Sequence, residues 1–311
     1  SFTVGFIMTQ SLCRLDDFKD NCGFGMIAQI QGQSSHQLLQ NAIQALTCMT
    51  HRGGVSADGK TGDGCGLLMQ KPDSFLRAVI KDTLNIELPE VYAVGSVMLN
   101  ADASRRDKSK EIFEEELRRQ GLTTIGWRTV PTNNTCLGSI ALESLPVFEQ
   151  VFVGPGTIVD DKKFNARLFM GRRKAEIRLV ADDCFHMASL GTNVLSYKGL
   201  MMPVDLPGFY LDLADPRLET AICVFHQRFS TNTMPRWPLA QPFRMLAHNG
   251  EINTIVGNRN WSVARTSKYK TDLIPDLIEA APLVNRTGSD SSSLDNMLEM
   301  LVTGGMDLHL A

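Results

Sequence analysis

Strand-like runs follow one another along this chain without a helix between each pair, and the helix-like segments come in groups. Apolar, β-prone runs occur at 67–70, 91–99, 123–130, 147–153, 185–190, 221–229 and 245–248, in addition to the stretch after Cys22. Helical periodicity occupies 104–120, 160–181, 251–264 and 291–301, and a further helix, capped by Ser34 or Ser35, is expected over 38–49. A doubly wound parallel sheet would alternate strand and helix. The pattern therefore predicts an α+β fold of antiparallel sheets covered by helices.

Composition and charge argue against nucleic acid and membrane as partners of this chain. The 311 residues are 43% hydrophobic, which is enough for a large core, and the net charge of -3 without a basic stripe argues against nucleic acid. No stretch approaches the roughly 20 apolar residues of a membrane span, and the apolar run 4–8 lacks a basic leader. We therefore expect a cytoplasmic protein. The seven cysteines have no CxxC spacing, so we expect no metal and no cofactor in this chain.

Residues 54–61 have the spacing of a phosphate-binding P-loop, with Lys60 and Thr61 at its end. The surrounding order is wrong, because a P-loop leaves a strand and opens a helix, whereas this segment leaves a helix and enters a strand. Asp58 and Asp63 would also place negative charge beside the phosphates. We interpret the segment as a glycine-rich turn beside an active site.

Polar residues stand at the ends of apolar runs in four segments: 21–25, 226–231, 248–253 and 288–291. Each has an ordinary explanation when taken alone. A cysteine in a strand is usually structural, an arginine there is usually in a salt bridge, Asn-Gly is a turn, and an Asp before serines is a helix cap. Their combination in one chain requires a different explanation.

Through these segments the chain resembles the class II glutamine amidotransferases, and more narrowly the amidotransferase domain that begins the glutamate synthase large subunit. The matching motifs are residues 20–25, 51–53, 60–66, 226–243, 247–254 and 287–293. The resemblance covers nearly all of the chain after Cys22. It implies a four-layer αββα sandwich, with two antiparallel sheets between helix layers, of the N-terminal nucleophile hydrolase type.

The resemblance makes the Cys22 thiol the nucleophile and the α-amine of the same residue its base. A free amine with a pKa near 8 exchanges protons at neutral pH, whereas a peptide nitrogen does not. We therefore expect residues 1–21 to be a propeptide or an added leader that must be removed, with self-processing as a hypothesis. Residues 22–311 are then the amidotransferase domain, and the end after an expected helix and Gly-Gly predicts a truncated C-terminus.

The remaining roles also come from the resemblance. It places the Asn249 side-chain amide and the Gly250 backbone N–H in the oxyanion hole. Arg228 fits the α-carboxylate of glutamine, because its planar fork holds two oxygens, and Asp290 fits the α-ammonium.

Thr231 and His248 complete the implied set of substrate-binding residues. Residues 231–243 contain three prolines and Trp237, and we expect them to form a loop that closes over glutamine. An ordinary Pro-rich surface loop is the alternative.

The implied product, ammonia, would pass to a synthase domain or subunit that converts 2-oxoglutarate to glutamate. FMN and an iron-sulfur cluster would belong to that missing region, with a small electron-donating subunit as a further partner. Two other readings stay open: a hydrolase of the same fold acting on another amide, which Arg228 and Asp290 disfavour, and a catalytically silent scaffold.

Overall fold

Two antiparallel sheets form the centre of the structure, a computed structural model that describes residues 23–227 and 233–311. Strands β1 (Phe24–Ala28), β8 (Ile222–Gln227), β2 (Cys65–Gln70) and β7 (Val194–Gly199) lie in that order in the first sheet. The second sheet has the order β4 (Thr123–Thr129), β5 (Val147–Gly154), β3 (Ala93–Leu99) and β6 (His186–Gly191). All pairings between neighbouring strands are antiparallel.

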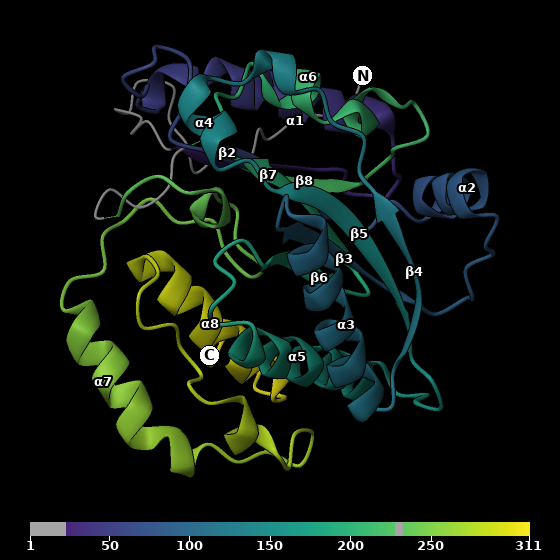
Figure 1. The fold of residues 1–311 in the computed structure, drawn as a ribbon, viewed down its shortest axis with the longest axis vertical. Coiled ribbons are helices and arrows are strands. Elements are labelled where there is room, and N and C mark those ends of the chain that lie inside the picture. Colours follow the sequence, from purple (N-terminus) through teal and green to yellow (C-terminus); the bar gives the residue numbers. More distant parts are fainter. Residues whose placement is uncertain (1–22, 228–232) are drawn as a thin grey trace, which may run out of the picture.

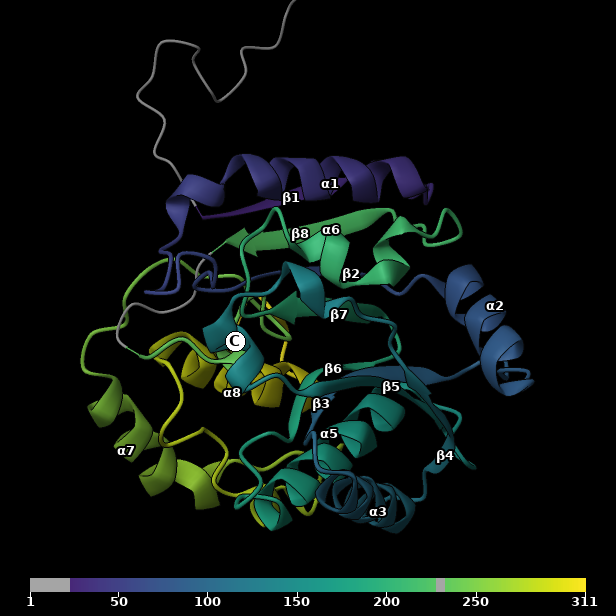
Figure 2. The ribbon, with the colours of Figure 1, turned by 45° about the horizontal axis from the view of Figure 1, so that its top comes forward.

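Helices cover the outer face of each sheet. Helix α1 (His36–Cys48) packs on β1 and β8, whereas α3 (Ala103–Arg119) and α5 (Asp161–Arg178) pack on the second sheet and on each other (Figure 2). Helix α2 (Asp73–Leu84) lies at one side of the sandwich (Figure 1). The layering confirms the predicted αββα sandwich.

The C-terminal part of the chain adds two helices beside these layers. Helix α8 (Asp290–Thr303) packs against α5, and α7 (Ile255–Arg265) lies at the periphery of the molecule (Figure 1). Among the described residues, the shorter helices are α4 (Ser139–Glu143), α6 (Leu206–Phe209) and 3-10 turns at Thr50–Arg52, Asn134–Cys136, Leu211–Ala214, Trp237–Leu239, Thr266–Lys268 and Leu277–Ala280. Among the described helices, none combines the length and the apolar composition that a membrane span requires.

Helix α1 forms where its sequence pattern predicts it. The side chain of Ser35 caps the helix by accepting a hydrogen bond from the backbone N–H of Leu38 at 3.2 Å. One face is buried against the first sheet, and it consists of Leu38, Leu39, Ala42, Ile43 and Leu46. This face belongs to a core cluster that continues between the two sheets.

A buried ion pair bridges the layers inside that core. Arg128 of β4 donates two hydrogen bonds to Asp212, at 2.7 and 2.8 Å, and both side chains are about 95% buried. The hydroxyl of Tyr197 on β7 donates to the same carboxylate at 2.8 Å, and Gln150 of β5 accepts from Arg128 at 2.9 Å. The cluster therefore joins strands of both sheets.

Four elements differ between the sequence expectations and the structure. Residues 245–248 form no strand, because their backbone bonds to side chains of Gln241 and Asp295 rather than to a neighbouring strand. Helix α7 begins at Ile255 instead of 251. Helix α2 and strand β7 were not predicted, although both are present.

Candidate active site

The candidate site begins where the start of β1 meets the end of β8. In the antiparallel register Phe24 lies opposite His226, and the backbone N–H of Gln227 donates to the backbone oxygen of Gly23 at 2.6 Å. Cys22, Arg228 and Thr231 lie outside the described residues. Gly23 and Gln227, the sequence neighbours of Cys22 and Arg228, are therefore hydrogen-bonded to each other.

Asn249 lies against Gly23. A β-carbon built on Gly23 would be 3.0 Å from Oδ1 and 3.3 Å from Nδ2 of Asn249, and 2.6 Å from the backbone oxygen of Gln227. A glycine is thus needed at position 23 for this close approach. The predicted oxyanion donor consequently packs against the residue that follows the predicted nucleophile in sequence.

His248 is held by hydrogen bonds from three directions. Its backbone N–H and C=O both bond to the side chain of Gln241, and His226 Nε2 lies 3.3 Å from the same carbonyl oxygen. Its imidazole Nδ1 lies 3.0 Å from Oγ of Ser291. The ring also packs on Gly250, since a β-carbon there would be 2.9 Å from His248 Nε2.

Asp290 is the first residue of α8 and is 5% exposed. The helix cap is Ser289, whose side chain accepts from the N–H of Ser292, so the ordinary reading of Asp290 as a cap is wrong. One carboxylate oxygen of Asp290 accepts from the N–H of Ile252 at 2.8 Å, and the other accepts from the N–H of Ser291 at 2.7 Å. Asp290 thereby joins α8 to the segment that carries Asn249 and Gly250.

The described part of the predicted closing loop is firmly packed over 237–243. Trp237 is 3% exposed and donates from Nε1 to the backbone oxygen of Ala141 at 3.3 Å. Gln241 and Phe243 are also buried. The alternative of a Pro-rich surface loop is therefore wrong for these residues.

Lys198, next to the last residue of β7, is a buried lysine that the sequence analysis did not single out. Its side chain is 1% exposed, and Nζ donates to the backbone oxygen of Pro238 at 3.1 Å and lies 5.0 Å from the centre of the Phe243 ring. Burial, together with the nearby Arg244, lowers the pKa of Lys198 to about 7, although Asp295 opposes this shift.

The glycine-rich segment 54–61 forms a turn, as the sequence predicted. Asp58 accepts hydrogen bonds from the N–H groups of Lys60 and Thr61 and from the Thr61 hydroxyl, and these bonds hold the pKa of its carboxyl below its usual range. The N–H of Ile140 donates to the same carboxyl at 3.0 Å. The loop is followed by β2, not by a helix, and its local donors are directed at Asp58.

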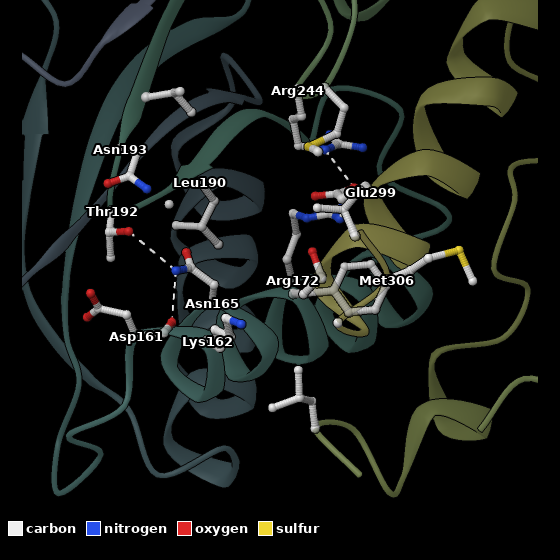
Figure 3. A pocket seen from close by; sticks show the side chains of 18 of the residues that line it. Asp161, Lys162, Asn165, Arg172, Leu190, Thr192, Asn193, Arg244, Glu299 and Met306 are labelled. Atoms are coloured by element: carbon white, nitrogen blue, oxygen red, sulfur yellow. Dashed lines mark hydrogen bonds and ion pairs between the residues drawn. The ribbon is translucent and has the colours of Figure 1, made fainter. Parts of the chain in front are cut away.

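The cavity in Figure 3 lies apart from the predicted site residues. Its volume is about 610 Å³, and its walls come from α5, the turn between β6 and β7, and the end of α8. Arg172 and Arg244 project into it, and both are paired with Glu299, at 2.6 and 3.0 Å. The charges of Arg172, Arg244 and Glu299 are therefore already paired with one another.

The described residues contain one group of side chains whose possible metal-ligand atoms lie within 4.8 Å of one another. It consists of Asp182, Asp183 and Cys184. Asp182 already accepts hydrogen bonds from Asn100 and Ser109, at 3.3 and 2.7 Å. Its carboxylate thus has a structural role between β3 and α3.

Sequence reasoning missed Gln241 and Ser291 as well as Lys198. The available signals were weak: Gln241 is a lone amide in the mostly apolar segment 237–243, and Lys198 is the one charged residue of the stretch 194–199. Neither signal shows which backbone group the side chain contacts.

Comparison with known proteins gives a consistent result. The model of the family described as glutamine amidotransferases class-II matches residues 22–311. The glutamate synthase [NADPH] large chain of Bacillus subtilis is 40% identical over 301 residues, which are 95% of this chain and 20% of the relative. Ferredoxin-dependent glutamate synthase 2 of Synechocystis is 40% identical over 296 residues, covering 92% of this chain and 18% of the relative.

Glutamate synthase [NADH] of Saccharomyces cerevisiae is 37% identical over 300 residues, covering 92% of this chain and 14% of the relative. The chain thus spans about a fifth or less of the length of these curated relatives. Because the family model covers almost the whole sequence, the chain belongs to the class-II glutamine amidotransferases.

Proposed function

We propose that this chain hydrolyses L-glutamine to glutamate and ammonia, as the amidotransferase domain of a glutamate synthase. The observation that carries the proposal is the packing of the Asn249 amide against Gly23, next in sequence to Cys22. An amide donor beside a thiol is the arrangement that acyl transfer from a side-chain amide requires.

In the proposed reaction the sulfur of Cys22 attacks the side-chain amide carbon of glutamine. The thiol proton moves to the α-amine of Cys22 and from there to the leaving nitrogen, which departs as ammonia. Asn249 and the backbone N–H of Gly250 donate to the carbonyl oxygen while it carries negative charge. Water then hydrolyses the thioester to glutamate and frees the thiol.

Four other residues recognise the free amino acid in this proposal. Arg228 binds the α-carboxylate, Asp290 binds the α-ammonium, and Thr231 and His248 complete the substrate site. The burial of Asp290 supports its part, because a carboxylate with little access to water attracts an ammonium group strongly.

The α-amine can act as a base only when no residue precedes Cys22. We therefore propose that residues 1–21 are removed, and the start of the family match at Cys22 supports this proposal. The ammonia would be used by a synthase region that adds it to 2-oxoglutarate in the cytoplasm.

FMN and an iron-sulfur cluster would belong to that synthase region. The lack of cluster spacing among the cysteines of this chain supports the assignment of the cluster. The printed names of the relatives carry NADPH, ferredoxin and NADH. The proposal therefore does not specify the electron donor. It also leaves open whether a small electron-donating subunit takes part.

The test is stoichiometric labelling by a glutamine analogue that carries a diazoketone in place of the amide. Intact mass and N-terminal sequencing would first establish whether Cys22 is the terminal residue. We expect one label per chain, blocked by glutamine and lost in Cys22→Ala. Cys48→Ala is the matched control, because Cys48 is an exposed free thiol outside the site. Full glutamine hydrolysis by a chain that retains Ser1 would contradict the proposed base.

A further inference from the structure

The side chain of Gln241 clamps the backbone of His248 at both of its polar groups. The N–H of His248 donates to Oε1 of Gln241 at 2.9 Å, and Nε2 of Gln241 donates to the carbonyl oxygen of His248 at 2.9 Å. Gln241 is fully buried. One amide side chain thus satisfies two backbone groups of a single residue, as a neighbouring strand otherwise would.

The segment that carries Gln241 is itself fixed on both sides. Upstream, Trp237 is buried and Pro238 accepts a hydrogen bond from Lys198. The backbone of Gln241 also approaches β2 closely, since a β-carbon on Gly66 would be 2.8 Å from its carbonyl oxygen.

Downstream, the chain turns between Phe243 and Leu246, with a backbone hydrogen bond of 2.9 Å. The N–H of Met245 donates to Asp295 of α8 at 2.8 Å. The clamp is therefore attached to the first sheet on one side and to α8 on the other.

His248 directly precedes Asn249, which lies against Gly23. Fixing both backbone groups of His248 fixes the position from which the Asn249 side chain and the Gly250 N–H extend. Preorganised donors stabilise a developing charge only when they are already in place, and a misplacement of about 1 Å can cost roughly 100-fold in rate.

The same residue also connects to the proposed ammonium site. Nδ1 of His248 contacts Oγ of Ser291, and the N–H of Ser291 donates to Asp290. Gln241 reaches Asp290 only through His248 and Ser291. Its loss should therefore displace the oxyanion donors more than the carboxylate that binds the substrate ammonium.

We infer that Gln241 is a positioning residue for the oxyanion hole, an inference that rests on the proposed glutaminase function. It touches neither substrate nor nucleophile in this role. Its removal should weaken binding of the tetrahedral state much more than ground-state binding of the amino acid.

Two variants separate the two halves of the clamp. Gln241→Glu keeps the shape and one acceptor, and in its ionised form it replaces the donor to the His248 carbonyl with an oxygen, so its kinetics are measured above the pKa of the buried carboxyl. Gln241→Met keeps the approximate length and removes both hydrogen bonds. Gln150→Met is the matched control, because Gln150 is equally buried and hydrogen-bonded but belongs to the Arg128 cluster away from the site.

The measurements are kcat and KM for glutamine, the affinity for glutamate, and the affinity for glutamate γ-semialdehyde. The aldehyde accepts the thiol to give a tetrahedral adduct whose oxygen needs the oxyanion donors. For both Gln241 variants we expect kcat to fall about 10- to 100-fold. Aldehyde affinity should fall by the same factor as kcat/KM, with KM and glutamate affinity changing less than about threefold.

Gln150→Met should lower the melting temperature without lowering kcat or the aldehyde affinity. If Gln241→Met does not fold, the isosteric Gln241→Glu decides the matter. Folded Gln241 variants with unchanged kcat and aldehyde affinity, or with a change in KM alone, would overturn the inference while the proposed function stands. A processed wild-type protein that neither hydrolyses glutamine nor binds the aldehyde would overturn both.

Discussion

The carboxylate of Asp290 accepts a hydrogen bond from the backbone N–H of Ile252, at 2.8 Å. The two residues come from segments that are 38 positions apart, the start of α8 and the stretch just after Asn249 and Gly250. Under the proposed function, one carboxylate would therefore help to hold the oxyanion segment in place and also bind the substrate ammonium.

Asp290→Asn should separate these two tasks. The amide oxygen can still accept from Ile252, but the negative charge is lost, and hydrogen bonds to charged groups contribute about 1.5–3 kcal/mol. We expect the glutamine KM to rise about 10- to 100-fold with a smaller change in kcat and in melting temperature. Steady-state kinetics and thermal unfolding would check this. An unchanged KM would remove Asp290 from the substrate site.

Gly23→Ala tests the close approach of Asn249 to β1. The added methyl group would meet the backbone oxygen of Gln227 at 2.6 Å and the Asn249 amide at 3.0 Å, so the strand or the amide must shift. We expect kcat for glutamine to fall by at least about 10-fold. Gly257→Ala in α7 is the control, because a β-carbon there meets nothing within 4 Å. Equal activities of the two variants would contradict the proposed contact's importance.

The sequence predicted correctly those elements whose cap and apolar face lie within a single stretch of chain. Helix α1 has a cap at Ser35 and one apolar face, and both are readable within a single stretch of chain. Helix α7 shows the opposite case. Its predicted first turn is absent because the N–H of Ile252 bonds to Asp290 and Thr254 adopts a left-handed backbone with φ of 59°. No pattern within that stretch reveals a partner on α8.

The residues of the candidate site also divide into those that local motifs identified and those that only the fold reveals. Asn249, Gly250 and Asp290 were named from their motifs, and the structure places their segments together. Gln241 was missed because its role depends on a backbone seven residues later, at the end of the stretch 245–248 that the sequence predicted to be a strand. The catalytic and substrate-binding roles of the three motif residues, like those of Cys22 and Arg228, remain predictions from the resemblance.

The buried pair of Arg128 and Asp212 should matter for stability rather than for catalysis. Arg128→Met leaves the Asp212 carboxylate buried without its cation, and breaking such a pair costs about 3–5 kcal/mol. The double variant Arg128→Met with Asp212→Leu should recover a large part of this loss, because neither charge remains. Chemical unfolding of the three variants would measure the difference. A double variant as unstable as the sum of the singles would show that the pair does not act as a unit.

Lys198 should make the stability of the protein depend on pH in the mildly alkaline range. Its pKa is about 7 in the folded protein, against an ordinary value of 10.5. Between these values the unfolded chain binds a proton that the folded chain does not, so the free energy of unfolding rises with pH.

Below about pH 7 both states are protonated, and the cost of burying the charge is fully present. Lys198→Met removes that cost and also the hydrogen bond to Pro238. Both the neutral amine and the ammonium group can donate this bond, so its loss lowers stability across the whole pH range. The stability of Lys198→Met relative to wild type should thus be greatest near pH 6.5 and should fall towards pH 9.5, by at most about 1.4 kcal/mol per pH unit.

Denaturant unfolding of both proteins across this range gives the comparison, and the exposed Lys162→Met variant gives the background for losing a lysine. Because Arg244 and Asp295 act on the pKa of Lys198 with opposite sign, Asp295→Asn should lower that pKa further and so extend the pH dependence of stability to lower pH. A difference between wild type and Lys198→Met that stays flat from pH 6.5 to 9.5 would mean that the buried amine keeps its proton, in which case its bond to Pro238 is that of an ammonium group.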